Sequence, residues 1–451
     1  MCGRPIIVTG GPVGGLTAQA RSVRELGAER VFVLGSEGRG AGPVPKEDEA
    51  EWLALEVSGS SIIDVVRAGH RALLDLPGPA RAAIERFDPG REALVLAGFL
   101  NELPEVAGRP CLAFRRPEWV ALEDKVVVDA LWDRADVARA PSVVVPVERA
   151  ALVGAARELD RGSGTVWAAD ARDGYHGGGE GLRWVRSGDD VAIDEAMAFL
   201  AARADQARVM PFLEGVPCGI HGLVFDDYVA ALRPLEMVTL RRDPAGELFY
   251  AGVASYWDPA PDDREIMRDV ARRVGALLRD EVAFRGPFTV DGVMTVGGFL
   301  PTELNPRSGA GHQAMAAALR NLPFQILNAA ISAGISLDFR PAELEALIVA
   351  RADEQRGGGT WRAVPGRAVE VHDRAVVYED AGYRWAGEGE PPDGSVIAGP
   401  STVGAFVRLS LDPARTPRGA SVAPRAAAFW RFADEHLGTG VGPLRPSTAV
   451  R

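Results

Sequence analysis

Short apolar runs and amphipathic segments alternate over the first 116 residues of the chain. The run Pro5–Val8 predicts a strand, the glycine-rich stretch Gly10–Gly15 a turn, and apolar residues at helical spacing over 16–26 a helix. A second apolar run at Val31–Leu34 predicts the next strand. Because a strand, a helix and a strand in this order typically form a parallel sheet, we predict an N-terminal parallel α/β domain over residues 1–116.

The pattern changes near residue 117, where helices and strands mix and several strands follow one another between 219 and 255. Strands without intervening helices are typical of an antiparallel sheet. Pro261 opens an amphipathic helix, and Phe288–Leu304 has the pattern of a β-hairpin. We predict a second domain over 117–342. Its other expected elements are helices at about 122–135, 148–160, 191–204 and 313–334, and strands at about 141–146, 165–169, 182–185 and 209–213.

The composition shifts again after about residue 345, towards glycine and short strands. This pattern predicts a small α+β appendage over 343–451, with a last helix at about 425–437 and a frayed tail from Gly438. The strands expected there are Ala368–Val371, Val376–Tyr378, Ser395–Ala398 and Gly404–Leu409.

Charge and composition narrow the function classes. The 451 residues carry a formal net charge of −12, which argues against a broad nucleic-acid or membrane surface. No apolar run is long enough for a transmembrane helix, and the N-terminus has the pattern of a strand rather than of a signal peptide. The three cysteines are scattered, which fits a reducing, cytoplasmic location. Only two basic residues are lysines, Lys46 and Lys125, so a lysine here is a candidate for a specific role.

The hairpin FTVDGVMTVGGFLPTELNPRSGAG carries the strongest chemical signal. A three-residue loop with Gly298 in the left-handed conformation places Asp291 directly opposite Glu303, with their Cβ atoms about 5 Å apart. Since side chains alternate along a strand, Glu303, Asn305 and Arg307 share one face. Two such carboxylates repel each other unless a cation lies between them, and carboxylate and amide oxygens suit Mg²⁺. We therefore predict a metal site at Asp291, Glu303 and Asn305, with Arg307 beside it as a catalytic residue that contacts a phosphate.

Two alternatives remain open for this hairpin. A two-residue turn would pair Asp291 with Leu304 and place Glu303 on the other face, which would break the site. An ordinary solvated hairpin face with one ion pair is the second alternative. The opposite face, with Phe288, Val290, Met294 and Leu304, is expected to pack into a core.

The hairpin resembles that of the ATP-grasp superfamily, in which an acid on one strand is followed by Glu-x-Asn on the next and often by Arg. Residues 123–146, EDKVVVDALWDRADVARAPSVVVP, resemble the segment of these enzymes in which a lysine precedes a helix and a proline-bounded strand. Residues 208–215, RVMPFLEG, resemble the strand that binds adenine. The resemblance covers about residues 117–340.

This resemblance implies an ATP-grasp domain and an ATP-dependent carboxylate–amine ligase that uses Mg²⁺. Such an enzyme forms an amide through an acylphosphate and releases ADP and phosphate. The resemblance also implies that Lys125 contacts the ATP phosphates and that Met210, Phe212 and Leu213 line the adenine site. A narrower resemblance, of residues 228–258 to pheganomycin-type peptide ligases, implies a peptide or amino-acid ligase of specialised metabolism.

The chain departs from the family at one position. Family members often carry a second lysine on the strand before the glycine-rich loop, where this chain has Ala168 and Ala169. Arg172 or Arg183 is a candidate substitute.

The glycine-rich loop 174–181, within 164–207, has the position of a lid. Backbone N–H groups at Gly177 and Gly178 are then expected to approach the phosphates, and a plain flexible connector is the alternative.

Three further residues are candidates because of their place between the adenine segment and the hairpin. Arg233 and Arg241 can hold a phosphate or a substrate carboxylate, so we predict catalytic roles for both. Glu236 is a candidate cofactor-binding residue that could serve a metal, a ribose or an ammonium group. A solvated strand face is the alternative for all three.

Two other functions compete with the ligase. One is a non-catalytic nucleotide-binding protein with the same fold, since the second lysine is missing. The other is a nicotinamide-dependent oxidoreductase, but Gly10–Gly15 lacks the G-x-G-x-x-G spacing of dinucleotide-binding sites. The expected partners are small-molecule or peptide carboxylates and amines, without nucleic acid or membrane, and a homodimer is a possible assembly.

Overall fold

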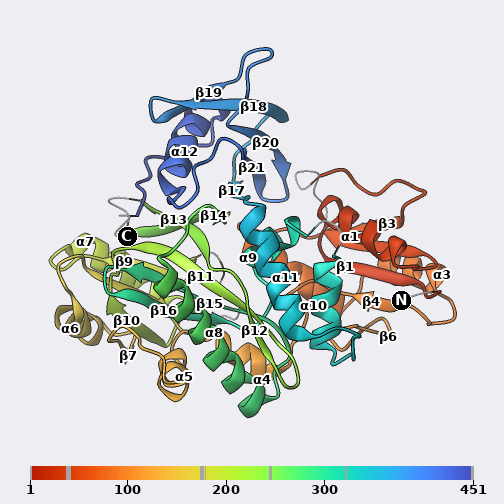
Figure 1. Ribbon diagram of the computed structural model, residues 1–451, viewed down its shortest axis with the longest axis horizontal. Helices are drawn as coiled ribbons and strands as arrows, with labels where there is room; N and C mark the ends of the chain where they lie inside the picture. Colours follow the sequence, from red (N-terminus) through yellow and green to blue (C-terminus); the bar gives the residue numbers. More distant parts are fainter. Residues whose placement is uncertain are drawn as a thin grey trace.

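The computed structural model describes residues 3–36, 42–172, 177, 179–242, 246–319 and 322–447 (Figure 1). Its N-terminal domain contains a parallel sheet in the order β3-β2-β1-β4, which confirms the predicted parallel α/β arrangement. The strand β3 was absent from the sequence prediction. The elements of this domain are β1 (Ile6–Pro12), α1 (Val13–Glu25), β2 (Val31–Ser36), β3 (Glu51–Leu55), α2 (Ile62–Leu74), α3 (Gly78–Phe87), β4 (Leu94–Leu96), β5 (Glu105–Val106) and β6 (Arg109–Pro110).

The glycine-rich stretch Gly10–Gly15 is not a separate turn. Strand β1 continues to Pro12 and helix α1 begins at Val13. A Cβ atom at Gly10 would lie 2.4 Å from the Cα atom of Gly98, so the glycines let the ends of β1 and β4 approach closely. Close packing therefore explains this motif without a ligand.

The second region begins with a small antiparallel sheet in the order β7-β10-β8-β9. Helices α6 and α7 cover one face of this small sheet, where Leu152 and Ile193 pack with Trp167 and Val209. The helix expected at 122–135 is interrupted at residues 124–127, so Lys125 lies in a connection rather than on a helix. The elements are α4 (Pro117–Val120), η1 (Ala121–Glu123), α5 (Val128–Arg134), β7 (Val143–Pro146), α6 (Arg149–Leu159), β8 (Thr165–Ala169), β9 (Leu182–Val185), α7 (Asp190–Ala201) and β10 (Gln206–Pro211).

The central sheet has the order β14-β13-β11-β15-β16, with β12 paired to β11. Helix α8 packs on one face through Met267 and Val274, beside Phe288, Val290 and other apolar residues of the hairpin. The predicted core face of the hairpin is thus confirmed. The elements are β11 (Val216–Val224), β12 (Val229–Ala231), β13 (Leu235–Arg242), β14 (Glu247–Ala254), α8 (Pro261–Val282), β15 (Gly286–Thr295) and β16 (Gly298–Asn305).

Helices α9 (Ala310–Ala317), α10 (Phe324–Ser332) and α11 (Pro341–Glu354) connect the parts of the molecule (Figure 1). Ile326 on α10 packs in the N-terminal core with Ile6 and Val8. Ile348 on α11 packs with Leu223 of the central sheet. These helices hold the N-terminal domain against the central sheet.

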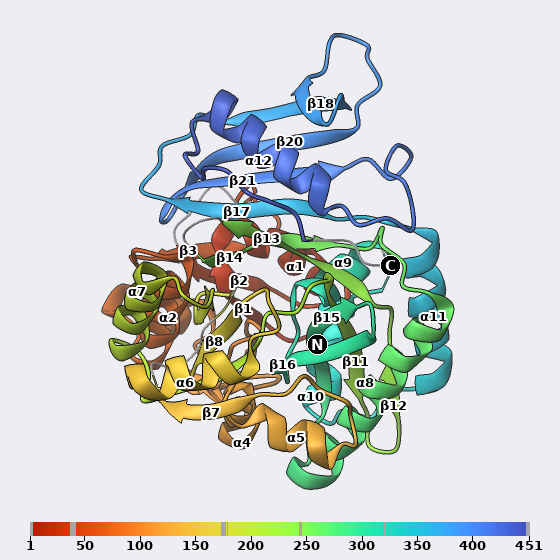
Figure 2. The same ribbon diagram turned by 90° about the vertical axis from the view of Figure 1, so that its left-hand side faces the viewer.

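The C-terminal appendage is an antiparallel sheet in the order β17-β21-β20-β18-β19, covered by helix α12. Figure 2 shows β17 as the strand of this appendage sheet next to β13 and β14. The prediction of a strand at Ala368–Val371 was wrong, and β17 and β19 were missed. The elements are β17 (Gly359–Pro365), β18 (His372–Glu379), β19 (Gly382–Trp385), β20 (Gly394–Ser401), β21 (Gly404–Leu411) and α12 (Ala423–Leu437).

The expectation of a frayed tail is wrong as far as Ser447. Asp434 accepts hydrogen bonds from the backbone N–H groups of Val441 and Gly442, each at 2.7 Å. Arg445 then pairs with Arg241 of β13 through two backbone hydrogen bonds of 2.8 and 2.9 Å. In the described ranges, no helix combines the length and the apolar character needed to span a membrane.

Candidate functional site

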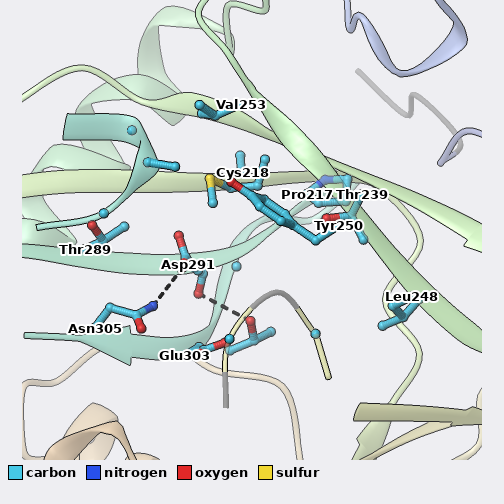
Figure 3. A pocket seen from close by; sticks show the side chains of 18 of the residues that line it. Pro217, Cys218, Thr239, Leu248, Tyr250, Val253, Thr289, Asp291, Glu303 and Asn305 are labelled. Carbon is cyan, nitrogen blue, oxygen red and sulfur yellow. Dashed lines mark hydrogen bonds between the residues drawn. The ribbon is translucent and has the colours of Figure 1, made fainter. Parts of the chain in front are cut away.

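A cavity of about 760 Å³ lies where the small sheet, the central sheet and the appendage meet. The small sheet contributes Val166 and Met210, the central hairpin contributes Asp291 and Glu303, and the appendage contributes Trp361. This volume is in the usual range for cofactor and substrate pockets. Figure 3 shows Asp291, Glu303 and Asn305 on one side of this cavity.

The hairpin brings the three predicted metal ligands together. Asp291 on β15 pairs directly with Glu303 on β16, and Thr289 pairs with Asn305. The side chains also touch, since Asn305 Nδ2 donates a hydrogen bond to Asp291 Oδ2 at 2.9 Å (Figure 3). The alternative register, with Glu303 on the other face, is thereby excluded.

The predicted pairing holds for a different reason from the one inferred from the sequence. Thr295 pairs with Gly298, so the turn has two residues between the paired positions rather than three. That register alone would place Thr302 opposite Asp291. A β-bulge between Asp291 and Gly292 skips Thr302 and restores Glu303 to the position opposite Asp291.

Asp291 is half-buried, and one of its carboxylate oxygens, Oδ1, is buried without a hydrogen-bond partner among the described residues. Gly219 on β11 makes room for it, since a Cβ atom there would lie 2.4 Å from Oδ1. Burial, followed by the nearby Glu303 carboxylate, raises the pKa of Asp291 to about 7. Both causes disfavour the charged form, and a bound cation would oppose both.

These residues fit a hard divalent cation. Asp291 Oδ1 has no partner, Glu303 uses Oε1 in an ion pair, and Asn305 supplies an amide oxygen. Oxygen donors of this kind are those that Mg²⁺ takes in proteins, usually with water and phosphate oxygens completing the shell. Nowhere in the described part of the chain do three or more His, Cys, Asp or Glu side chains gather as in a metal site. The candidate site has two carboxylates and therefore depends on the amide and on ligand oxygens.

Two cations flank the carboxylates. Lys125 Nζ lies 3.0 Å from Glu303 Oε1, and its side chain is only 10% exposed. Arg307 donates to Asn305 Oδ1 at 2.7 Å, and its Nε lies 2.7 Å from Glu123 Oε1. Both cations line the cavity, where they can neutralise phosphate charge.

The segment expected to bind adenine also lines the cavity. Met210 is the penultimate residue of β10, and Phe212 and Leu213 follow the strand along the same wall. The Phe212 ring stacks on Trp184, with centroids 4.5 Å apart, and the Arg241 guanidinium lies 5.0 Å from its centroid. Arg241 reaches the cavity too, while its guanidinium is paired with Glu214 at 2.7 Å.

The structure places two of the predicted site residues elsewhere. Arg233 is fully buried in ion pairs with Asp258 and with Asp353, the latter at 3.0 Å. Glu236 is fully buried and accepts hydrogen bonds from Ser421 Oγ at 2.5 Å and from the backbone N–H of Val422 at 2.8 Å. Neither lines the cavity. Buried polar and charged groups require partners. Arg233 and Glu236 find theirs in segments outside the central sheet and so join this sheet to other parts of the molecule.

A buried arginine lies beside the position where the expected second lysine is missing. Arg208 on β10 pairs directly with Ala168 on β8, and both line the cavity. Arg208 is buried and its Nη2 lies 2.7 Å from Asp129. The suggested substitutes lie elsewhere, since Arg172 pairs with Asp205 and Arg183 packs on the Phe199 ring.

The glycine-rich loop is described in part. Gly177 lines the cavity, in agreement with its expected position, whereas Gly178 lies outside the described residues.

Sequence reasoning missed the contributions of the two other domains. Phe99 reaches the cavity from the N-terminal domain, and Trp361, Phe406 and Arg408 reach it from the appendage. The sequence did predict a strand at Gly404–Leu409, which contains Phe406 and Arg408. A strand pattern alone does not show which part of the molecule the strand faces.

The fold is the ATP-grasp fold, as comparison with solved structures shows. The chain is similar to N5-carboxyaminoimidazole ribonucleotide synthetase in its ADP complex, with a TM-score of 0.54, 14% identity, and 96% of this chain and 98% of that chain covered. It is also similar to the biotin carboxylase domain of 2-oxoglutarate carboxylase from Hydrogenobacter thermophilus, crystallised with MgADP, ADP and bicarbonate. There the TM-score is 0.58, the identity 15%, and the coverage 92% and 87%.

A third similar structure is carboxyaminoimidazole ribonucleotide synthase from Aspergillus clavatus with ATP, at a TM-score of 0.52 and 13% identity, covering 96% of this chain and 99% of that one. No family model and no curated protein matches the sequence. At these identities the comparisons establish the fold, and the activity has to be argued from the site.

Proposed function

We propose that this protein is an ATP-dependent ligase that joins a carboxylate to an amine and forms ADP and phosphate. The observation that carries the proposal is the polar face of the hairpin, where Asp291, Glu303 and Asn305 meet Lys125 and Arg307 at the wall of the cavity. The similar solved structures, crystallised with ADP, ATP or MgADP, support a nucleotide in this cavity.

The chemistry follows from the poor reactivity of a carboxylate. Its negative charge and resonance repel an attacking amine. Transfer of the γ-phosphoryl group of ATP to the carboxylate breaks the β–γ phosphoanhydride bond, forms an acylphosphate and releases ADP. The amine then attacks the acyl carbon, phosphate leaves, the amine loses a proton, and an amide remains.

The residues of the chain position the reactants and neutralise charge. Asp291, Glu303 and Asn305 would hold Mg²⁺, which when bound offsets the negative charge of the phosphates. Lys125 and Arg307 point their charges into the same part of the cavity and stabilise the transferred phosphoryl group.

The remaining walls bind adenine and exclude water. Met210 and Leu213 offer backbone and apolar contacts for the base, beside the stacked ring of Phe212. Arg208 adds a buried cation opposite Ala168, where it can offset phosphate charge. Walls from the small sheet, the central sheet and the appendage would limit the access of water to an acylphosphate, which water would otherwise hydrolyse.

For the substrates, we propose amino acids or peptides and a cytoplasmic location. The likeness of residues 228–258 to pheganomycin-type peptide ligases supports this choice. This stretch forms β12 to β14 and supplies Met237, Thr239 and Tyr250 to the cavity wall. A direct assay with amino-acid and peptide substrates tests this choice.

A coupled ADP-release assay over pools of carboxylates and amines tests the proposal. ADP that forms only when both pools are present, together with an amide product in the mass spectrum, would support the ligase. ATP binding without turnover over a broad pool would indicate a non-catalytic nucleotide-binding protein instead. Tight NADH binding would indicate an oxidoreductase.

A further inference from the structure

The appendage sheet has two different faces. Along β21, Val407 and Leu409 are buried in the core beneath helix α12, and Trp430 of that helix donates a hydrogen bond to Thr360 of β17 at 2.7 Å. The residues that alternate with them, Phe406 and Arg408, point the other way because side chains alternate along a strand. Phe406 and Arg408 line the cavity.

An aromatic wall surrounds this second face. Trp361 on β17 pairs directly with Arg408, so the two side chains lie on the same face of the sheet. The Trp361 ring lies edge-to-face with Tyr250 of β14, with centroids 6.4 Å apart. Gly252 permits this approach, since a Cβ atom there would lie 2.8 Å from the Trp361 ring. Trp361, Tyr250 and Phe406 form an apolar wall with a cation at its edge.

Arg408 differs from the other cations of the cavity. Lys125, Arg208, Arg241 and Arg307 each have an acidic partner within 3.0 Å. Arg408 is exposed, and across the described ranges it has no ion pair, hydrogen bond or ring contact of its side chain. Its neighbours on the two adjacent strands are Trp361 and Ile397. A guanidinium with five donors and no partner among the described residues suits, at a cavity wall, a carboxylate from the ligand.

The reacting carboxylate cannot be the one that Arg408 binds. That group has to lie beside the hairpin, where Lys125 and Arg307 face the transferred phosphoryl group. An anion at Arg408 is therefore a second group that does not react. An amino acid or peptide that reacts through its amine carries such a group, its own free carboxylate.

We propose that Arg408 binds the unreacted carboxylate of the amine substrate, while Trp361, Tyr250 and Phe406 take an apolar or aromatic body. This inference rests on the proposed ligase function and specifies its second substrate. The amine would then be selected by the appendage, a part of the chain separate from the ATP-binding sheets. Arg408 is a specificity-determining residue in this proposal and takes no part in the chemical step.

The test compares Arg408→Gln with the wild-type protein on paired amines that differ only in the carboxylate. The pairs are L-phenylalanine with L-phenylalaninamide, and the dipeptide Phe-Phe with its C-terminal amide, each assayed for ADP release with the carboxylate found in the pool assay. Loss of a charge-assisted hydrogen bond should raise the KM of the free-carboxylate amine about 10- to 100-fold. The KM of ATP, the kcat at saturation and the KM of the amide should stay within about twofold.

Two further variants sharpen the result. Arg408→Lys keeps the charge but loses the bidentate geometry, so it should fall between the wild type and the glutamine variant. Arg374→Gln is the matched control, because Arg374 is an exposed arginine of the same sheet and does not line the cavity. It should behave as the wild type.

Equal KM values for the free carboxylate and the amide in the wild type, or no change in Arg408→Gln, would overturn the inference while leaving the ligase intact. If no substrate pair releases ADP, calorimetric titration with Phe-Phe decides the role of Arg408 independently of turnover. Weaker binding in Arg408→Gln then supports the carboxylate site, and equal or absent binding overturns it. Titration with phenyl phosphate separates a phosphate site, since weakening confined to that probe would also overturn the carboxylate assignment.

Discussion

Gly219→Ala is the sharpest test of the metal site, because it changes neither charge nor any ligand residue. Gly219 on β11 pairs with Asp291 on β15. The added Cβ atom would lie 2.4 Å from Asp291 Oδ1 and 3.3 Å from Thr289 Cγ2. An ordinary contact begins at 3.4 Å, so the carboxylate oxygen must move by the difference, 1.0 Å.

A displacement of this size is large for Mg²⁺, which requires near-ideal octahedral geometry with bonds of about 2.0–2.1 Å. It would also disturb the 2.9 Å hydrogen bond from Asn305 to Asp291. We expect kcat to fall by as much as about 100-fold, since a misplacement of 1 Å near a reacting centre can have an effect of this size. The Mg²⁺ concentration for half-maximal ADP release should rise in parallel.

Gly222→Ala is the matched control on the same strand. Its Cβ atom would also lie 2.4 Å from a neighbour, but that neighbour is the Phe288 ring in the core. This variant should lose stability through overpacking, by about 1–3 kcal/mol, and keep its Mg²⁺ dependence. Mg²⁺ titration of ADP release and thermal unfolding of both variants measure the two effects. A Gly219→Ala protein with the Mg²⁺ requirement and kcat of the wild type would refute the assignment of Asp291 as a ligand.

Three further predictions concern single residues. Glu303→Gln should lower kcat about 100-fold or more, since it removes a charge at the reacting phosphates, while the melting temperature stays near that of the wild type; turnover at the wild-type rate would contradict the metal assignment. Lys125→Ala should raise the KM of ATP about 10-fold or more and leave that of the carboxylate nearly unchanged, and steady-state titration of each substrate measures both; a larger effect on the carboxylate would contradict the phosphate contact. Burial raises the pKa of Glu236 from 4.5 to about 7. Between these two pH values the folded protein holds a proton that the unfolded chain has released. The free energy of unfolding should therefore fall as the pH rises from about 4.5 to about 7. The difference of about 2.5 units corresponds to a loss on the order of 3 kcal/mol. Glu236→Gln should lack this loss in urea unfolding at pH 5 to 8, and an unchanged pH slope would show that another group causes it.

Local patterns predicted the ligand-bearing hairpin well. Alternation along a strand places Glu303 and Asn305 on one face whatever lies around them, and the apolar Leu304 between them is buried on the other face. Arg307 lies two residues beyond the end of β16 and lines the same cavity. The pairing of Asp291 with Glu303 was also predicted, but through a three-residue loop that does not exist. The β-bulge at Thr302 depends on how β15 and β16 fit together, so strand pattern alone could not reveal it.

Residues of the same type in the same stretch of sequence differ in their surroundings, and only the folded structure shows this difference. Arg233 and Arg241 lie in the same run of strands, yet Arg233 is buried with Asp258 and Asp353 while Arg241 reaches the cavity. Arg233 and Asp353 are 120 residues apart in the chain (353 minus 233). A partner so distant cannot be inferred from the residues around Arg233. Glu236 likewise finds its partners at Ser421 and Val422.

The sequence by itself determined the parallel α/β start of the chain, the acidic hairpin and the candidate role of Lys125, because these depend on periodicity and on residue types close together in the chain. It missed the strands β3, β17 and β19. Tertiary structure alone decided that Arg208 lies opposite Ala168, that Gly219 makes room for a carboxylate, and that one face of the appendage sheet closes the cavity. Each of these requires two strands distant in sequence to pair or pack in one register. The free energy that selects this register comes from burying the apolar face of the whole sheet. It therefore cannot be read from the sequence of any short segment.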